Sequence, residues 1–106
     1  MSDSSQPVAC RTEVFDEAQR ERYRTLLNQL RGAVTEVREL GDGYEFLLTS
    51  GVANCMGAME FATLERLCCP FLTFSISLKG SGGPLTVRLT GPAGTREVLA
   101  ASLLSG

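Results

Sequence analysis

The chain has 106 residues, of which 43% are hydrophobic and 21% are charged, and its formal net charge is −2. One folded domain with its own hydrophobic core is the expectation for this length. The sequence holds four cysteines and no histidine, which excludes Ser-His-Asp triads, Cys-His dyads and imidazole-bound metals. A soft metal held by cysteine, with or without carboxylate, is compatible with this composition.

The net charge and the N-terminal residues indicate which binding partners and which cell compartment to expect. Nucleic-acid binding needs a basic surface, so a negative net charge predicts no nucleic-acid partner. No apolar stretch approaches the ~20 residues that span a bilayer, so no membrane partner is expected. Residues 1–6 are polar, predict a disordered tail and lack the pattern of a signal peptide. We therefore expect a cytoplasmic protein whose cysteines are buried hydrophobes or thiol ligands, because thiols stay reduced in the cytoplasm.

The first predicted elements are a short strand and a helix. Residues 8–12 alternate between apolar and polar side chains, which favours a strand. Asp16 and Gln19 have the spacing of a capping box, which predicts that a helix opens at Asp16. Apolar residues at helical spacing continue to Val34, with charged residues on the opposite face.

The rest of the chain predicts hairpins that alternate with helices. Strands at about 34–40 and 44–49 are joined through Asp42-Gly43, a dipeptide typical of tight turns. A helix from about 52 to 67 ends before Pro70, which disfavours helical backbone at the preceding residue. The remaining elements are strands at about 72–78 and 85–90 and a helix that begins at Gly91-Pro92.

The order strand-helix-strand-strand-helix-strand-strand-helix predicts an α+β fold. One antiparallel-rich sheet with helices on one face satisfies this order. The first six elements have the order of a ferredoxin-like unit, and a β-meander covered by helices is the alternative. We see no internal repeat or boundary, so residues 7–106 are predicted to form a single α+β domain.

Cys68-Cys69, where the second helix meets a strand, is the most informative chemical feature. Adjacent thiols can converge on one soft ion, such as mercury(II), copper(I), zinc or trivalent arsenic. On a continued helix Glu65 lies about 300° from Cys68 and about 400° from Cys69, so its carboxylate approaches both sulfurs. Cys10 becomes a third ligand if its predicted strand runs beside this junction. The predicted metal site is therefore Cys10, Glu65, Cys68 and Cys69, with Cys55 outside it, ~20 Å along the helix.

Several observations bear on these cysteines. A helix C-terminus raises the pKa of a thiol, which favours a metal-driven ligand over a fast nucleophile. Cysteine is also often buried without a function, which is the competing interpretation for Cys68. A disulfide between Cys68 and Cys69 would be strained and is the least favoured state.

Glu60 is a second acidic residue on the predicted apolar stripe of this helix. A structural role would pair it with an arginine such as Arg88, and this interpretation is favoured. A functional role would make it a buried carboxylate with a raised pKa.

The segment 65–72, Glu-Arg-Leu-Cys-Cys-Pro-Phe-Leu, preceded by Glu60, resembles a group of small bacterial proteins with an E-R-x-C-C-P-F signature. The members of this group are mostly uncharacterised. The residues at 8–10, 42–44 and 89–92 look like landmarks of the same group, so the resemblance covers about residues 7–99. The group is found among heavy-metal, especially mercury, resistance genes. The resemblance implies functional positions at Cys10, Glu60, Glu65, Cys68 and Cys69, and it supplies no activity.

Three classes of function follow from these observations. The leading hypothesis is a small cytoplasmic protein that binds a soft ion, such as mercury, zinc or copper, for sequestration, delivery or sensing. The second is a thiol-dependent enzyme with Cys69 as the reactive centre and Glu65 as the base, and we lean against an enzyme. The third is an interaction module with buried cysteines, whose sheet face meets a partner or a second copy in a homodimer. The separation and exposure of the sulfurs distinguish the first hypothesis from the third.

Overall fold

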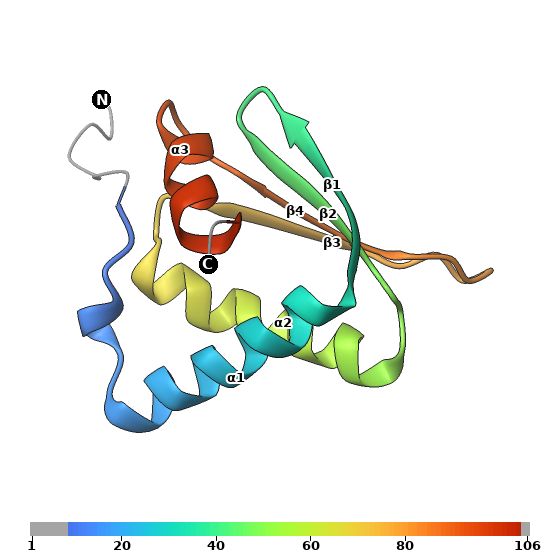
Figure 1. Cartoon of the computed structure of the whole chain (residues 1–106), viewed down its shortest axis with the longest axis horizontal. Helices are drawn as coiled ribbons and strands as arrows, with labels where there is room; N and C mark the ends of the chain where they lie inside the picture. Colours follow the sequence, from blue (N-terminus) through green and yellow to red (C-terminus); the bar gives the residue numbers. More distant parts are fainter. Residues whose placement is uncertain (1–8, 105–106) are drawn as a thin grey trace.

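A computed structural model describes residues 9–104 as a four-stranded antiparallel sheet with helices on one face (Figure 1). The predicted α+β class is therefore confirmed. In chain order the elements are η1 (Thr12–Val14), α1 (Glu17–Ala33), β1 (Val34–Leu40), β2 (Gly43–Leu48), α2 (Val52–Cys68), β3 (Thr73–Ser77), β4 (Leu85–Thr90), α3 (Thr95–Leu99) and η2 (Ala100–Leu104). No helix in residues 9–104 is long and apolar enough to cross a membrane.

Two hairpins build the sheet, whose strand order is β1-β2-β4-β3. They join where β2 pairs with β4, and Phe46 lies opposite Val87 in that register. Since side chains alternate between the faces of a strand, one face of both strands is apolar and meets the helices. A side chain at Gly43 would collide with the carbonyl oxygen of Leu89, so glycine is required at this close approach. The alternation of polar and apolar residues in these strands was sufficient to predict them.

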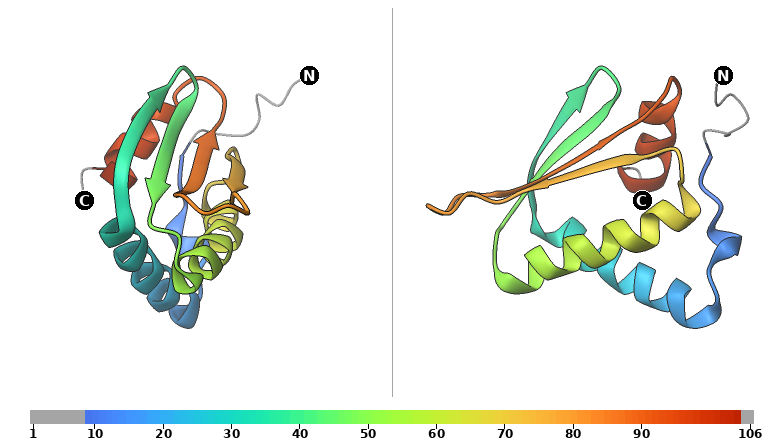
Figure 2. Two further views of the ribbon diagram at one scale, coloured as in Figure 1. Left: turned by 90° about the vertical axis from the view of Figure 1, so that its right-hand side faces the viewer. Right: turned by 180° about the vertical axis from the view of Figure 1, so that it is seen from behind.

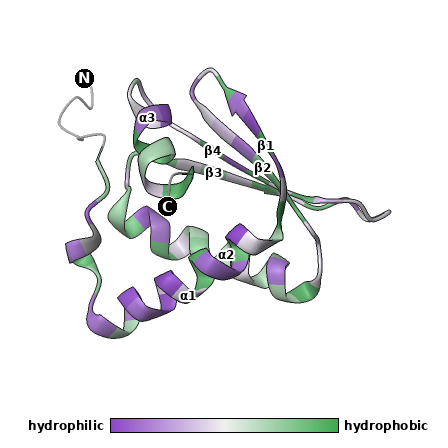
Figure 3. Ribbon diagram, in the orientation of Figure 1, coloured by the Kyte–Doolittle hydropathy of each residue, from purple (hydrophilic) through white to green (hydrophobic). Residues whose placement is uncertain are grey.

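Helix α1 begins as its sequence predicts. The N–H of Gln19 donates to Oδ1 of Asp16 at 2.7 Å, and the N–H of Asp16 donates to Oε1 of Gln19 at 3.0 Å. This reciprocal pair satisfies two backbone donors that a helix start leaves free. Hydrophilic and hydrophobic bands alternate along α1 (Figure 3), and Leu26 and Leu30 are buried on the face that it turns to the core.

The prediction of a strand at residues 8–12 is wrong for residues 9–12, the part of it that the structure describes. Residues 9–11 have no regular structure, and a short 3-10 helix follows at Thr12–Val14. The N–H of Arg11 donates to the carbonyl of Cys68 at 2.7 Å, so the segment hydrogen-bonds to a helix end and not to a strand. Without a first strand, the sheet of residues 9–104 lacks the central strand of a ferredoxin-like unit. Residue 8 and the predicted tail at 1–6 lie outside the described residues.

The last helix begins later than predicted. The N–H of Gly91 donates to the carbonyl of Asp42 at 3.0 Å, which keeps Gly91-Pro92 beside the β1–β2 turn. Gly94, with φ at 97°, then turns the chain through the left-handed region that favours glycine. Helix α3 starts at Thr95 and continues into the π-helical turn η2, and Leu99 and Leu103 enter the core.

The buried face of α2 is rotated from the predicted one. The side chain of Glu60, which lies on the predicted apolar stripe, is 43% exposed, and Met56 is 68% exposed, whereas Glu65 is completely buried. The buried residues of α2 are Gly57, Ala58, Phe61, Ala62, Glu65 and Cys68. This rotation follows from how α2 packs against α1, which Figure 2 shows from two further directions. It brings the carboxylate of Glu65 inside the molecule.

Candidate functional site: a buried cysteine and glutamate cluster

Four potential ligands meet at the C-terminal end of α2. Cys10, Glu65, Cys68 and Cys69 each offer one sulfur or oxygen atom, and these atoms all lie within 4.8 Å of one another. Glu65 and Cys68 belong to the last turn of α2, Cys69 caps it, and Cys10 comes from the segment before η1. The structure thus brings together all four residues of the predicted metal site, although Cys10 arrives from an irregular segment and not from a strand.

Local backbone bonds hold the helix end in this arrangement. The N–H of Cys69 donates to the carbonyl of Glu65 at 2.7 Å, and Cys69 itself has left the helical region at φ −127° and ψ 69°. Helix α2 therefore ends before Pro70, as the sequence predicted. The carbonyl of Cys68 would lack an intrahelical partner, and the N–H of Arg11 supplies one. This bond sets the N-terminal segment beside the adjacent cysteines.

Cys10 and Cys69 form a disulfide that closes a sequence separation of 59 residues, with their Cα atoms 4.5 Å apart. The expectation that these two cysteines are free thiols is therefore wrong for this form of the protein. The strained bond between Cys68 and Cys69 is not formed. Cys68 is a buried free thiol, and its Sγ lies 3.4 Å from Sγ of Cys69.

Glu65 is the acidic centre of the cluster. Its Oε2 lies 3.5 Å from Sγ of Cys69, and its Oε1 lies 3.9 Å from Sγ of Cys68. This confirms the prediction from helix geometry that the carboxylate approaches both sulfurs. Burial raises the pKa of Glu65, and hydrogen bonds from Tyr23 and Cys68 counteract part of this rise.

Tyr23 is a member of the site that the sequence pattern assigned only to the apolar face of its helix. Its hydroxyl donates to Oε1 of Glu65 at 2.7 Å. Its ring lies between those of Phe15 and Phe61, with centroids 5.2 Å and 5.5 Å away. Burial, followed by the negative charge of Glu65, raises the pKa of Tyr23, so the phenol stays protonated and can donate. The available signal was a tyrosine among buried positions, because a buried hydroxyl needs a partner.

Cys68 is buried, with 1% of its surface exposed. Burial raises the pKa of Cys68 to about 12, and the negative charge of Glu65 adds to this rise. The predicted rise in the pKa of this thiol is confirmed, but its largest cause is burial and not the helix end. At neutral pH the metal-free residue is a thiol, so a bound cation would have to displace its proton.

Glu60 and Cys55 do not belong to the cluster. Both carboxylate oxygens of Glu60 accept hydrogen bonds from Arg22 of α1, at 2.7 Å and 2.8 Å. The hydrogen bond from Arg22 lowers the pKa of Glu60, so the less favoured alternative of a buried carboxylate with a raised pKa is wrong. Glu60 does pair with an arginine, but not with Arg88, which pairs with Glu45. The thiol of Cys55 contacts the carbonyl of residue 50, as expected for a cysteine outside the site.

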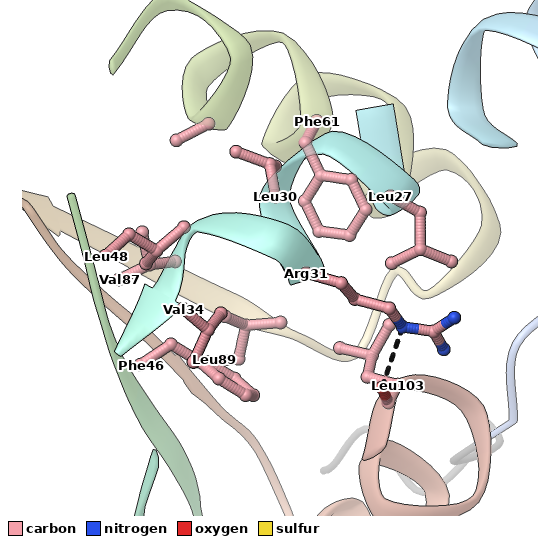
Figure 4. Close-up of a pocket in the computed structure, with 11 residues that line it drawn as sticks. Leu27, Leu30, Arg31, Val34, Phe46, Leu48, Phe61, Val87, Leu89 and Leu103 are labelled. Carbon is pink, nitrogen blue, oxygen red and sulfur yellow. Dashed lines mark hydrogen bonds between the residues drawn. The ribbon is translucent and has the colours of Figure 1, made fainter. Parts of the chain in front are cut away.

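An apolar cavity of about 70 Å³ lies between α1, α2, the sheet and η2. None of the four cluster residues lines it. Arg31 borders it and donates to the carbonyl of Leu103 at 3.2 Å (Figure 4) and to that of Ser102 at 3.3 Å, which ties α1 to η2. The cavity is therefore separate from the cysteine and glutamate cluster.

No protein-family model, curated protein or solved structure matches the chain. The resemblance to the group with the E-R-x-C-C-P-F signature therefore stays a prediction. The chemistry of the cluster follows from its own donor atoms. Of the four cluster residues, only Cys68 and Glu65 are free to bind an ion in the oxidised form, whereas reduction would provide three thiols and one carboxyl group.

Proposed function

We propose that the reduced protein binds one soft metal ion or metalloid through the sulfurs of Cys10, Cys68 and Cys69, assisted by Glu65. The observation that carries this proposal is the convergence of four donor atoms within 4.8 Å. Three sulfurs around an ion, each at ~2.3 Å, would stand roughly 4 Å apart. The separation of 3.4 Å between the sulfurs of Cys68 and Cys69 is close to this spacing.

The donor set points to a particular class of ion. Thiolates select mercury(II), copper(I), zinc and trivalent arsenic over hard cations. Because Cys68, Cys69 and Glu65 are almost completely buried, a complex without net charge is favoured over a charged one. Two thiolates, those of Cys68 and Cys69, neutralise mercury(II), and Cys10 would then remain a neutral thiol, whereas three thiolates neutralise arsenic(III). We therefore propose that the bound ion is mercury(II) or arsenic(III). Mercury also agrees with the mercury-resistance genes that the resemblance of the sequence signature implies.

Binding agrees better than catalysis with the state of the thiols. The raised pKa of Cys68 makes this free thiol a weak nucleophile at neutral pH. A metal ion overcomes the same obstacle, since it displaces the proton when it binds. Sequestration, delivery or sensing of the ion in a cytoplasm is the role that we propose.

Titration of the reduced protein with mercury(II), zinc and copper(I) tests this function. The protein is reduced, freed of reductant without oxygen, and titrated while ion stoichiometry and sulfur-to-metal charge-transfer absorbance are recorded. We expect one tightly bound ion per chain and loss of this binding in the double variant Cys68→Ser/Cys69→Ser. Cys55→Ser is the matched control and should bind like the unmodified chain. Unchanged stoichiometry in the double variant would overturn the proposal.

The disulfide favours thiol–disulfide exchange as a second candidate function. Under this alternative Cys69 is a redox centre, and the cluster reacts with thiols and not with ions. Reaction with thiols but no soft-ion binding by the reduced protein would support this alternative.

A further inference from the structure

We propose that an external thiol opens the Cys10–Cys69 disulfide by attacking Sγ of Cys10, and that this reduction frees the N-terminal segment from the end of α2. Reduction would also create the three-thiol ion site, and this second consequence rests on the proposed function. The substrate class is a small anionic thiol, such as glutathione. The proposal assigns Cys10 as the sulfur that is attacked and Cys69 as the leaving group.

The difference in exposure between the two bonded cysteines selects the sulfur that is attacked. Cys69 has 0% of its surface exposed, and the neighbouring Cys68 has 1%. Cys10 is only partly buried, and it lies between the exposed residues Ala9 and Arg11. A thiol from solution therefore has access to Cys10 and not to Cys69. The positive charge of Arg11, next in the chain, favours the approach of an anionic thiol.

The reaction consists of two exchange steps. In the first, an external thiolate bonds to Sγ of Cys10, the bond to Cys69 breaks, and Sγ of Cys69 leaves with the electron pair. In the second, another external thiolate attacks the external sulfur of the mixed disulfide and releases Cys10. Two external thiols are oxidised to one disulfide, the protein disulfide is reduced, and the two protons of those thiols end on Cys10 and Cys69.

The leaving sulfur has suitable neighbours. Sγ of Cys69 lies 3.4 Å from Sγ of Cys68 and 3.5 Å from Oε2 of Glu65. A thiol that forms at Cys69 therefore finds hydrogen-bonding partners in an otherwise apolar site. These contacts let Cys69 remain buried after the bond opens, so the released part is the Cys10 side of the former disulfide.

Apart from the disulfide, one backbone hydrogen bond and the packing of Cys10 and η1 hold the N-terminal segment at the helix end. In the part of the chain that the structure describes, one backbone hydrogen bond joins residues 9–14 to another element, and it runs from Arg11 to Cys68. A single hydrogen bond adds only about 1 kcal/mol of net stability. Phe15 is 3% exposed and anchors the chain where α1 begins. Reduction should therefore free residues 9–14 while leaving α1 in place.

Limited digestion with trypsin, without any metal, tests the release. Trypsin cleaves after arginine, and Arg11 lies within residues 9–14, the segment that the disulfide holds at the end of α2. We expect cleavage after Arg11 to be several-fold faster in the reduced protein than in the oxidised one. Cys68→Ser keeps the disulfide and should respond to reduction in the same way, whereas Cys10→Ser should be cleaved rapidly with or without reductant. Equal cleavage of the oxidised and reduced unmodified protein would overturn the proposed release.

Trapping the mixed disulfide tests which sulfur is attacked. The oxidised Cys68→Ser variant is exposed briefly to glutathione, quenched with acid, digested and analysed by mass spectrometry. Cleavage after Arg11, Arg66 and Lys79 separates Cys10, in residues 1–11, from Cys69, in residues 67–79. We expect most of the glutathione on residues 1–11, and a majority on residues 67–79 would refute the assignment of Cys10.

The two proposals can fail separately. If reduction releases the segment but the reduced protein binds no soft ion, the disulfide chemistry stands and the proposed function is wrong. If the oxidised protein binds the ion with full stoichiometry, ion binding stands and its link to the disulfide is refuted.

Discussion

The hydroxyl of Tyr23 donates a hydrogen bond of 2.7 Å to the completely buried carboxyl group of Glu65, 42 residues later in the chain. This bond joins α1 to the end of α2 at the point where the cysteines gather. The ring that supplies this hydroxyl is tilted against Phe15 and stacked on Phe61. A carboxyl group that would otherwise be buried among sulfurs thereby acquires a fixed orientation.

Tyr23→Phe should destabilise the protein, because it removes a donor from a buried carboxyl group. The expected loss is about 1–3 kcal/mol in the free energy of unfolding, measured by urea denaturation of the oxidised protein. Tyr44→Phe is the matched control, because no hydrogen bond from the Tyr44 hydroxyl occurs among the described residues. Equal losses in both variants would show that the bond to Glu65 contributes no specific stability.

Glu65 should make stability fall as the pH rises. Its pKa is raised in the folded protein, so the folded state binds more protons than the unfolded state above the ordinary glutamate pKa. Stability is fully present below that ordinary value and is lost progressively as the pH rises toward the higher folded pKa. Unfolding free energies measured between pH ~4 and pH ~8 should show this decline in the unmodified protein and a flatter profile in Glu65→Gln.

Glu60 provides a control of opposite sign for this pH dependence. The hydrogen bond from Arg22 lowers the pKa of Glu60, so its stabilisation is present above the ordinary glutamate pKa and fades as the pH falls. Glu60→Gln should therefore remove a contribution at neutral pH and leave the decline at higher pH unchanged. A profile for Glu60→Gln as flat as that of Glu65→Gln would contradict the assignment of the decline to Glu65.

Loss of the Cys10–Cys69 disulfide should lower stability considerably. A bond that closes a separation of 59 residues restricts the unfolded chain, and the chain-entropy relation gives about 4 kcal/mol for a loop of this size. Calorimetry of Cys10→Ser against the oxidised unmodified protein measures the effect, and reduction should reproduce most of it. Cys55→Ser, which leaves the disulfide intact, should change the melting temperature far less.

The number of sulfurs in the bound complex should depend on the ion. A neutral complex needs two thiolates for mercury(II) and three for arsenic(III), and charge is disfavoured in this buried site. Reduced Cys10→Ser should therefore keep mercury(II) binding through Cys68 and Cys69 and lose most of its affinity for arsenic(III). Competition with a small dithiol measures both affinities. Equal losses for the two ions would argue against charge neutrality as the selecting principle.

Local geometry explains what the sequence predicted well. The capping box of Asp16 and Gln19 spans three residues, and the approach of Glu65 to the two adjacent cysteines lies within one helical turn. Alternation of side chains likewise predicted β4, whose apolar residues are buried. In each case the interacting residues are close in the chain, so spacing alone determines which side chains meet.

Distant contacts explain what the sequence did not predict. Residues 9–11 have an alternating pattern that suits a strand, but the carbonyl of Cys68 at the end of α2 is their hydrogen-bond partner. The bond from Tyr23 to Glu65 and the pair between Arg22 and Glu60 depend on how α1 lies across α2. The same packing leaves Met56 exposed. Periodicity within one helix carries no information about the position of a second helix.

The disulfide also divides the chain mechanically. It joins Cys10 to Cys69, so α1, β1, β2 and α2 lie within a covalent loop, while β3, β4 and α3 follow it. If the two ends of the oxidised protein were pulled apart, the S–S bond would carry the force past that loop, and only residues outside it could extend far. In the reduced protein every element would bear the load. A single-molecule stretching trace would thus show two contour lengths, one for each state of one pair of sulfur atoms.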